Sequence, residues 1–149
     1  MGWDPAAMRR KLGLQVVGDQ AVRIREVREA RGPMRQAAPE SQLLAHVRQV
    51  ARQTGWLVYH THDSRKSEEG FPDLVMAKPG QGKPGRLIFA ELKSRTGKCT
   101  MEQQRWLALL RLTVPHLEVY EWRPEDWDSI VEVLTGHKGR ETYGDPTTA

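Results

Sequence analysis

Apolar and polar residues alternate along the middle of the chain with two different periods, first that of a helix and then that of a strand. From Glu40 to about Thr54, apolar side chains recur every three or four residues, which predicts a helix that opens at Pro39 and ends at Thr54-Gly55. Short apolar runs then predict strands over residues 56–60, 73–77 and 86–93, with polar or Gly/Pro-rich loops between them. Three strands in succession favour a meander.

The second half of the compact region returns to the helical period. Thr100 is a good N-cap for a helix that runs to about Leu112, and Pro115 ends it. A strand is expected over 116–122 and a last helix from 123 onward. The first of these helices is expected to bury Trp106, Leu107, Leu109 and Leu110, and the last to bury Ile130, Val131 and Leu134. The order helix, three strands, helix, strand, helix predicts an α/β fold, a mixed sheet with helices on its faces.

Composition narrows the class of protein. With 149 residues and 38% of them hydrophobic, the chain has room for one domain with a real core. No apolar run approaches the roughly 18 residues that a membrane-spanning helix needs. The single cysteine, Cys99, excludes an internal disulfide, and the basic residues near the start are not followed by the apolar core of a signal peptide. We therefore expect a cytoplasmic protein with no membrane partner.

Charge is unevenly distributed and suggests three regions. Residues 1–39 hold eight Lys or Arg and four acids, so the whole net charge of +4 lies there. This pattern predicts a basic N-terminal arm over 1–38, a compact domain over 39–135 and a loose, polar tail over 136–149. The arm is either a solvated tail or an arm that binds nucleic acid, and the sequence leaves both readings open.

Two carboxylates stand at the ends of neighbouring strands. Asp73 precedes the apolar run Leu74-Val75-Met76, and Glu91 ends another run of apolar residues. The strand period of two places Glu91 and Lys93 on one face. Such acids are often turn residues or part of a solvated sheet face, but the apolar flanks indicate buried strands, where a carboxylate needs a partner. Two oxygen ligands beside a lysine form a pattern typical of a site for a hard metal ion.

The motifs resemble one known family. Gly70-Phe71-Pro72-Asp73, then Glu91-Leu92-Lys93, then Gly97 and Gln103 six residues later, preceded by Glu40 on a helix, are similar to the VRR-NUC family of the PD-(D/E)xK nuclease superfamily, in particular its short phage and bacterial members. The resemblance extends over about 39–133. It implies the restriction-endonuclease-like core of that superfamily, in a bacterial or phage-infected cell.

The resemblance also implies roles for six residues. Asp73 and Glu91 would bind Mg²⁺, or Mn²⁺ in its place, with the backbone carbonyl of Leu92 as a third oxygen. Lys93 would orient or help deprotonate the attacking water and stabilise the phosphorane. Glu40 would bind the metal through a water or complete a second position, and Gln103 would hold Lys93 or the water. The implied reaction is hydrolysis of DNA to a 5′-phosphate and a 3′-hydroxyl.

The same resemblance points to a structure-selective endonuclease. Short members of the family are similar to Holliday-junction resolvases, so branched or flapped DNA is the expected partner, and a homodimer would let two sites act on paired strands. Basic loop residues are expected to grip the phosphate backbone without regard to sequence. They are Arg65, Lys66, Lys78, Lys83, Arg95 and Lys98. The alternative is a DNA-binding or assembly module on a nuclease-like fold, without turnover.

Several of these residues can also be explained without a role in catalysis. Glu40 is an acidic residue, and the helix dipole favours an acidic residue at the start of any helix. Gln104 follows Gln103, so a shift of one residue would exchange their roles. His60, His62 and Asp63 form a cluster that could bind zinc, face the scissile phosphate from a strand end, or belong to a plain loop, and no second cluster with ligand spacing accompanies it.

Overall fold

Among the residues that the structure describes, three helices, four strands and one short 3₁₀ helix follow one another along the chain, with the helices and strands in the expected order. The computed structural model describes residues 37–62, 66–80 and 84–136, so the basic arm up to residue 36 and the tail from 137 lie outside the described residues. No helix within these ranges is long and apolar enough to cross a membrane. The elements are α3 (Glu40–Gln53), β1 (Leu57–His60), β2 (Leu74–Lys78), β3 (Arg86–Leu92), α4 (Met101–Thr113), β4 (Glu118–Trp122), η1 (Pro124–Asp126) and α5 (Trp127–Thr135).

The strands form one mixed sheet in the order β1-β2-β3-β4. β2 is antiparallel to both β1 and β3, so these three strands make the expected meander, with Val75 of β2 opposite Tyr59 of β1 and Phe89 of β3. β4 pairs in parallel with β3. A parallel neighbour requires a crossover connection, and α4 supplies it.

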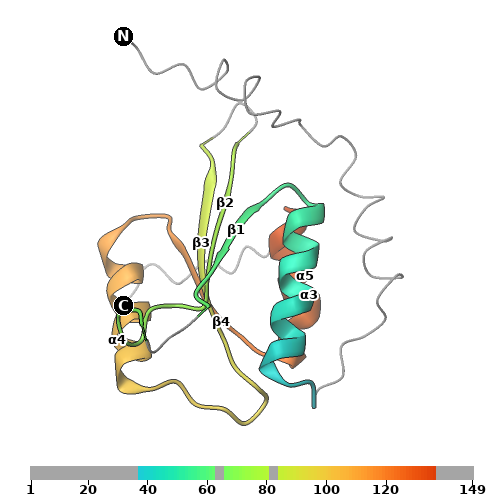
Figure 1. Ribbon diagram of the computed structural model, residues 1–149. Helices are drawn as coiled ribbons and strands as arrows, with labels where there is room; N and C mark the ends of the chain where they lie inside the picture. The colour runs from blue at the N-terminus through green and yellow to red at the C-terminus, as the bar shows by residue number, and fades with distance from the viewer. Residues whose placement is uncertain (1–36, 63–65, 81–83, 137–149) are drawn as a thin grey trace, which may run out of the picture.

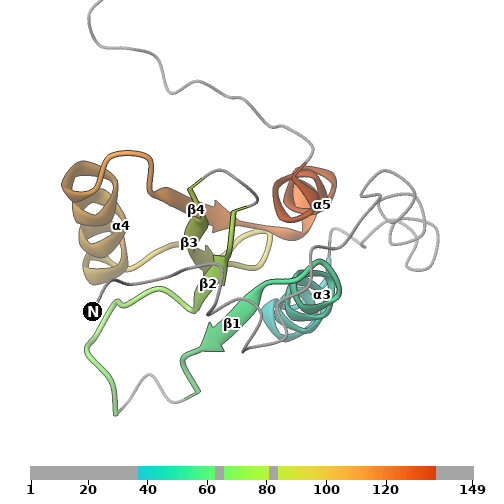
Figure 2. The same ribbon diagram turned by 90° about the horizontal axis from the view of Figure 1, so that it is seen from above.

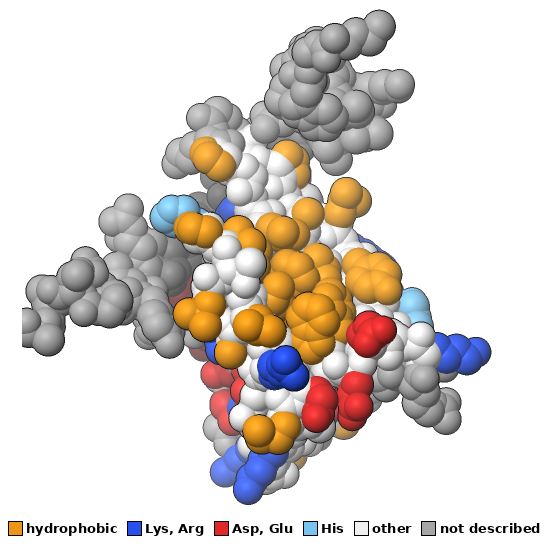
Figure 3. All heavy atoms as spheres, turned by 90° about the vertical axis from the view of Figure 1, so that its left-hand side faces the viewer, with side chains coloured by type: hydrophobic (Ala, Val, Ile, Leu, Met, Phe, Trp, Pro, Cys, Tyr) orange, Lys and Arg blue, Asp and Glu red, His pale blue; other side chains and the backbone are white. Residues whose placement is uncertain are grey.

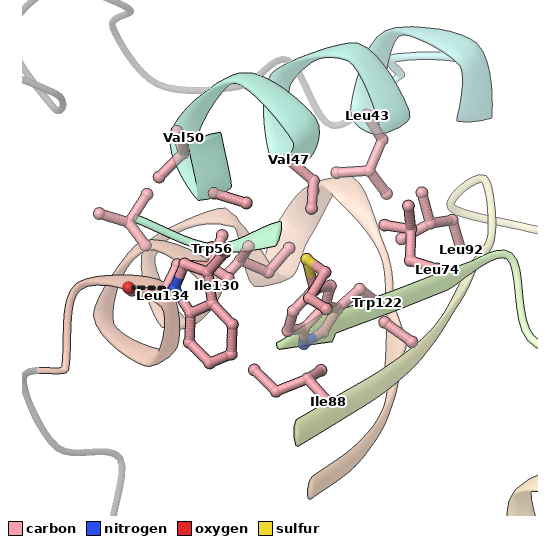
Figure 4. Packing of buried hydrophobic residues seen from close by; sticks show 14 of the residues in the cluster. Leu43, Val47, Val50, Trp56, Leu74, Ile88, Leu92, Trp122, Ile130 and Leu134 are labelled. Atoms are coloured by element: carbon pink, nitrogen blue, oxygen red, sulfur yellow. Dashed lines mark hydrogen bonds between the residues drawn. The ribbon is translucent and has the colours of Figure 1, made fainter. Parts of the chain in front are cut away.

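The helices divide between the two faces of this sheet, as the sequence predicted. Figures 1 and 2 show α3 and α5 side by side on one face and α4 on the other. The hydrophobic core lies on the α3/α5 face, where alternate residues of the strands, such as Met76 and Ile88, meet Val47 of α3 and Ile130 of α5 (Figure 4). The indole Nε1 of Trp56 donates a hydrogen bond to the carbonyl of Leu134 at 2.8 Å, which ties the start of β1 to the end of α5.

Three local expectations were wrong. β4 begins at Glu118 and not at residue 116, because the chain turns through Pro115 and His116, whose φ is 66°. The last helix is preceded by the separate 3₁₀ turn η1. In α4 only Leu107 is buried, and Leu109 is 51% exposed, because α4 packs mainly along β4 and no other described element covers much of its surface.

Candidate functional site

Asp73 and Glu91 meet on the α4 face of the sheet, at one end of β2 and β3. Asp73 directly precedes β2, and its backbone carbonyl accepts a hydrogen bond from the Thr61 N–H at 3.1 Å. Its side-chain Oδ2 accepts a hydrogen bond from the N–H of Leu92 at 2.8 Å, which fixes the carboxylate against β3. Burial is the main cause that raises the pKa of Asp73 above its usual value.

Glu91 is a buried carboxylate with one satisfied and one free oxygen. The residue is only 1% exposed, and its Oε1 accepts hydrogen bonds from Lys93 Nζ at 2.7 Å and from Gln103 Nε2 at 2.5 Å. Its Oε2 is buried and has no hydrogen-bond partner. Burial first, and the nearby charge of Asp73 in addition, raise the pKa of Glu91 to about 7. A buried oxygen of this kind is costly unless another group satisfies it.

Lys93 is held as a cation beside these acids. The residue is 8% exposed. Its backbone N–H donates to the carbonyl of Trp122, so the pairing of β3 with β4 continues to this residue. Because strand residues alternate between faces, the side chain of Lys93 lies on the same face as Glu91. Burial alone would lower the pKa of Lys93, but the hydrogen bond to Glu91 and the surrounding carboxylates outweigh it and raise the pKa. The site therefore contains a positive charge at neutral pH.

Gln103 reaches Glu91 because of the way α4 begins. Thr100 caps the helix: its side chain accepts from the Gln103 N–H, and the Oε1 of Gln103 accepts from the Thr100 N–H at 2.8 Å. This capping box leaves the Nε2 of Gln103 to donate to Glu91. Gln104 donates to the carbonyl of Cys99 instead, so the geometry resolves the one-residue question in favour of Gln103. Gln103 and Lys93 therefore donate to the same oxygen of Glu91.

Glu40 stands at the first position of α3, close to the loop that follows β3. Its Oε1 accepts a hydrogen bond from the Ser94 N–H at 3.1 Å. Gly97 lets the two segments approach, since a Cβ there would lie 3.3 Å from Glu40 Oε1 and 2.9 Å from Ser94 Oγ. Arg123 holds the same loop by donating to the carbonyl of Ser94 at 2.7 Å. No sequence pattern marks Ser94 or Arg123 as neighbours of the site.

The carbonyl of Leu92 owes its availability to Pro72. β2 and β3 pair Leu74 with Ala90, so extending the register places Pro72 opposite Leu92. Proline has no N–H, and the ladder bond that would otherwise occupy the Leu92 carbonyl is missing. The N–H of Leu92 bonds to Asp73, and the C=O of a strand residue points to the same side as its N–H. The carbonyl therefore lies on the Asp73 side of β3.

These donors fit a hard divalent cation. Two carboxylates and a carbonyl supply only oxygen, which Mg²⁺ prefers, and the buried Oε2 of Glu91 is an oxygen that lacks a partner. Within the described ranges, no group of three or more His, Cys, Asp or Glu side chains is placed to hold a metal. In this arrangement Glu40 accepts a hydrogen bond from the Ser94 N–H.

His60 and His62 lie near the site on its β1 side. Their rings stack edge to face with centroids 5.0 Å apart, and the Nδ1 of His60 is buried without a hydrogen-bond partner. Burial, with help from His62 and Arg48, lowers the pKa of His60. Asp63, the third member of the predicted cluster, lies outside the described residues. The zinc reading therefore has two histidines and no third ligand among the residues that the structure describes.

The basic residues proposed to contact DNA are more scattered than expected. Arg95 and Lys98 are exposed in the loop after β3, next to Gly97, and Lys66 is exposed in the loop before Asp73. Lys78 does not border the carboxylates, because it ends β2 at the opposite end from Asp73 and lies over the Trp56 ring. Arg65 and Lys83 fall outside the described residues.

Comparisons with known proteins concern the family and the fold of this chain. The family model described as "VRR-NUC domain" matches residues 15–123, which begins earlier than the resemblance seen in the motifs and includes part of the basic N-terminal segment. A solved structure titled "VRR_NUC domain" is similar in fold, with a TM-score of 0.51 and 20% identity, over 62% of this chain and 94% of that one. No curated protein matches the chain. The chain belongs to the VRR-NUC family, within the PD-(D/E)xK superfamily.

Proposed function

We propose that this protein is a metal-dependent, structure-selective DNA endonuclease that hydrolyses phosphodiester bonds to a 5′-phosphate and a 3′-hydroxyl. The observation that carries this proposal is the free, buried Oε2 of Glu91 on the same face as Asp73 and Lys93. An ion pair with a purely structural role would satisfy both oxygens of a buried glutamate. The pair of Glu91 with Lys93 leaves one oxygen of Glu91 available to a further positive group.

Asp73, Glu91 and the Leu92 carbonyl are the residues that would hold Mg²⁺ or Mn²⁺. The bound cation would polarise the scissile phosphate and lower the pKa of a coordinated water. Asp73 is oriented by the Leu92 N–H, and Glu91 by Lys93 and Gln103, so both carboxylates are fixed before any ligand arrives. Glu40 would act through a water.

Lys93 supplies charge to the reaction. Its ammonium donates to Glu91, and the surrounding carboxylates keep it protonated. Such a cation orients the attacking water and stabilises the extra negative charge that develops on the phosphate in the transition state. Lys93 is better suited to orienting the water than to deprotonating it, because the pKa of Lys93 is raised.

The substrate proposed is DNA, branched or flapped, bound by a homodimer. Support comes from family membership and from the exposed cations Arg95, Lys98 and Lys66 in loops near the carboxylates. Contacts of this kind are made to phosphates and carry no base sequence. Selectivity would then depend on the shape of the DNA that the two sites can reach.

A cleavage assay on flap, nick, junction and linear DNA tests the proposal. Wild-type protein should cleave with Mg²⁺ or Mn²⁺ and bind without turnover in Ca²⁺. Asp73→Asn and Glu91→Gln should abolish cleavage while keeping the fold and most DNA affinity, and Glu125→Gln, a change of an exposed acid in η1, should have no effect. Near-wild-type cleavage by either site variant would refute the assignment. Binding of DNA by the wild type with no cleavage of any substrate would favour the non-catalytic module instead.

A further inference from the structure

One end of the sheet carries two rows of apolar side chains, of which Leu57, Tyr59, Ala77 and Leu87 are exposed. Cross-strand pairing aligns Leu57, Ala77 and Leu87 in one row, and Tyr59, Val75 and Phe89 in the next. All six point to the α4 side, because Phe89 contacts Phe71, which contacts Trp106 of α4, and strand residues alternate between faces. We call these six residues the apolar sheet face.

The apolar sheet face is open in the part of the chain that the structure describes. α4 packs along β4, at the other edge of the sheet. α3 and α5 lie on the opposite face of the sheet (Figure 1). Leu57 is 68% exposed, Tyr59 61% and Leu87 42%. In Figure 3, which views the molecule from the α4 side, hydrophobic side chains gather over the centre of the surface. Contiguous apolar surface of this kind generally marks a binding site.

The apolar sheet face continues directly into the candidate active site. Tyr59 and Val75 are paired, and two residues further along the strands Thr61 bonds to Asp73. A rise of roughly 3.3 Å per residue puts this next row about 7 Å away, about two stacked-base spacings of 3.4 Å. Asp73 and Glu91 occupy the same face as Tyr59 and Phe89. A strand of DNA whose phosphate lies at the carboxylates would bring its neighbouring nucleotides over Tyr59.

We propose that the apolar sheet face binds the bases of unpaired nucleotides next to the scissile phosphate, with Tyr59 as the stacking surface. None of the six side chains carries a charge, so this surface offers a phosphate no ion pair, and the Tyr59 hydroxyl is the one hydrogen-bond donor among these side chains. The flat faces of bases, in contrast, stack on aromatic rings and pack on aliphatic groups without regard to sequence. A duplex hides its base faces and presents a charged backbone. The DNA on this side of the cut is therefore single-stranded.

This inference rests on the proposed nuclease function and makes it more specific, since it assigns a reason for structure selectivity. A second copy of the chain could also cover an apolar face, but the face runs without a break into the carboxylates, and covering it would block that approach to them. Continuity with the site therefore favours the substrate over a partner subunit. The two occupants give different results in the experiment below.

Equilibrium binding in the Asp73→Asn background tests the face without turnover. The probes are a fluorescent single strand, a fully paired duplex, and the same duplex with an unpaired flap. Stacking on an aromatic side chain contributes about 1–3 kcal/mol per base, so Tyr59→Ala should weaken binding to the single strand and the flap about tenfold and leave duplex binding unchanged. Tyr59→Phe keeps the ring and should stay within about twofold of the parent. Leu112→Ser, which changes an exposed leucine on α4, is the matched control and should have no effect.

Five outcomes decide whether the apolar sheet face binds unpaired bases. A selective loss of single-strand and flap affinity in Tyr59→Ala supports the proposal. Equal affinities for Tyr59→Ala and its parent overturn it, even if the wild type cleaves DNA. A dimer that dissociates in Tyr59→Ala, with unchanged single-strand affinity, or a marked loss of thermal stability would mean that another chain or segment covers the face, and would also overturn it. If binding depends on Tyr59 but the wild type cleaves no DNA, the apolar sheet face binds unpaired bases and the proposed nuclease activity is refuted.

Discussion

Gly70 lies against the backbone of the first turn of α4, where Gln103 begins its reach to Glu91. A Cβ on Gly70 would lie 2.5 Å from the Glu102 carbonyl carbon and 2.7 Å from the Gln103 nitrogen, and the φ of Gly70 is +83°. The loop that delivers Asp73 and the helix that delivers Gln103 therefore touch at a point where only glycine fits. The Gly-x-Pro-Asp motif thus positions α4 as well as the carboxylate.

Gly70→Ala should lower both stability and cleavage activity. Gly55→Ala serves as the control, because it separates the effect of the left-handed backbone from the effect of the contact with α4. Both glycines have positive φ, but a Cβ on Gly55 would meet only the side chain of Lys78 at 3.9 Å. Gly55→Ala should therefore lose about 1–2 kcal/mol from the left-handed conformation alone. Gly70→Ala must also move α4, and should lose more stability in urea unfolding and most of its cleavage. Equal losses in the two variants would contradict the contact.

Lys93→Ala should lower the single-turnover cleavage rate by about 10²-fold or more, because the charge acts in the transition state. Affinity for DNA should fall only slightly, since the ammonium is directed at Glu91. Lys98→Ala removes an exposed cation of the neighbouring loop and should show the opposite pattern, with weaker binding and little change in rate. Loss of affinity alone in Lys93→Ala would make this lysine a phosphate contact.

Gln103→Ala and Gln104→Ala form a matched pair on adjacent residues. Gln103 donates to the ionisable Glu91, and a hydrogen bond to a charged group contributes about 1.5–3 kcal/mol, so its loss should lower the cleavage rate about tenfold or more. Gln104 bonds to the carbonyl of Cys99, away from the carboxylates, and its loss should be nearly silent in the same rate assay. The reverse order would mean that α4 begins one residue out of the register described here.

Mg²⁺ should stabilise the protein more at pH 8 than at pH 5.5. Burial raises the pKa of Glu91 to about 7 from 4.5, so the stability linked to this carboxyl is present in full below about pH 4.5 and is lost as the pH rises through 7. A cation that binds the ionised form offsets this loss, and at pH 5.5 it must compete with protons. Thermal unfolding with and without Mg²⁺ measures the difference, and Glu91→Gln should remove it. Equal Mg²⁺ shifts at both pH values would argue against Glu91 as a ligand.

Two deletions test the basic N-terminal segment. Removing residues 1–14 takes away three bases and one acid and stays outside the matched family range, whereas removing 1–38 takes away eight bases and four acids and enters it. If the segment binds DNA, the slope of log affinity against log salt should become shallower, more so for the longer deletion. An unchanged slope would make it a solvated tail. Analytical ultracentrifugation of the same proteins shows whether the segment affects oligomeric state.

Local order along the chain was enough to predict the elements and the kinds of residue that carry the chemistry. The helical period after Glu40, the apolar runs before Lys78 and Glu91, and the N-cap Thr100 each act within a few residues. Burial of Glu91 could be inferred in the same way, because the residues on either side of it are apolar. Such signals depend on spacing alone, so a single sequence contains them.

Only the tertiary structure decided which of these residues meet. The parallel pairing of β4 with β3, the contact of Glu40 with Ser94 and the choice of Gln103 over Gln104 depend on crossovers and registers that span many residues. The same is true of Lys78. The sequence suggested a place near the site, but β2 runs away from Asp73 and Lys78 lies at its opposite end. The helical spacing predicts that Leu109 is buried, but it is exposed because no described element packs over it. Packing between distant elements has no local signature, and for that reason the sequence determined the parts of this site while the fold determined their arrangement.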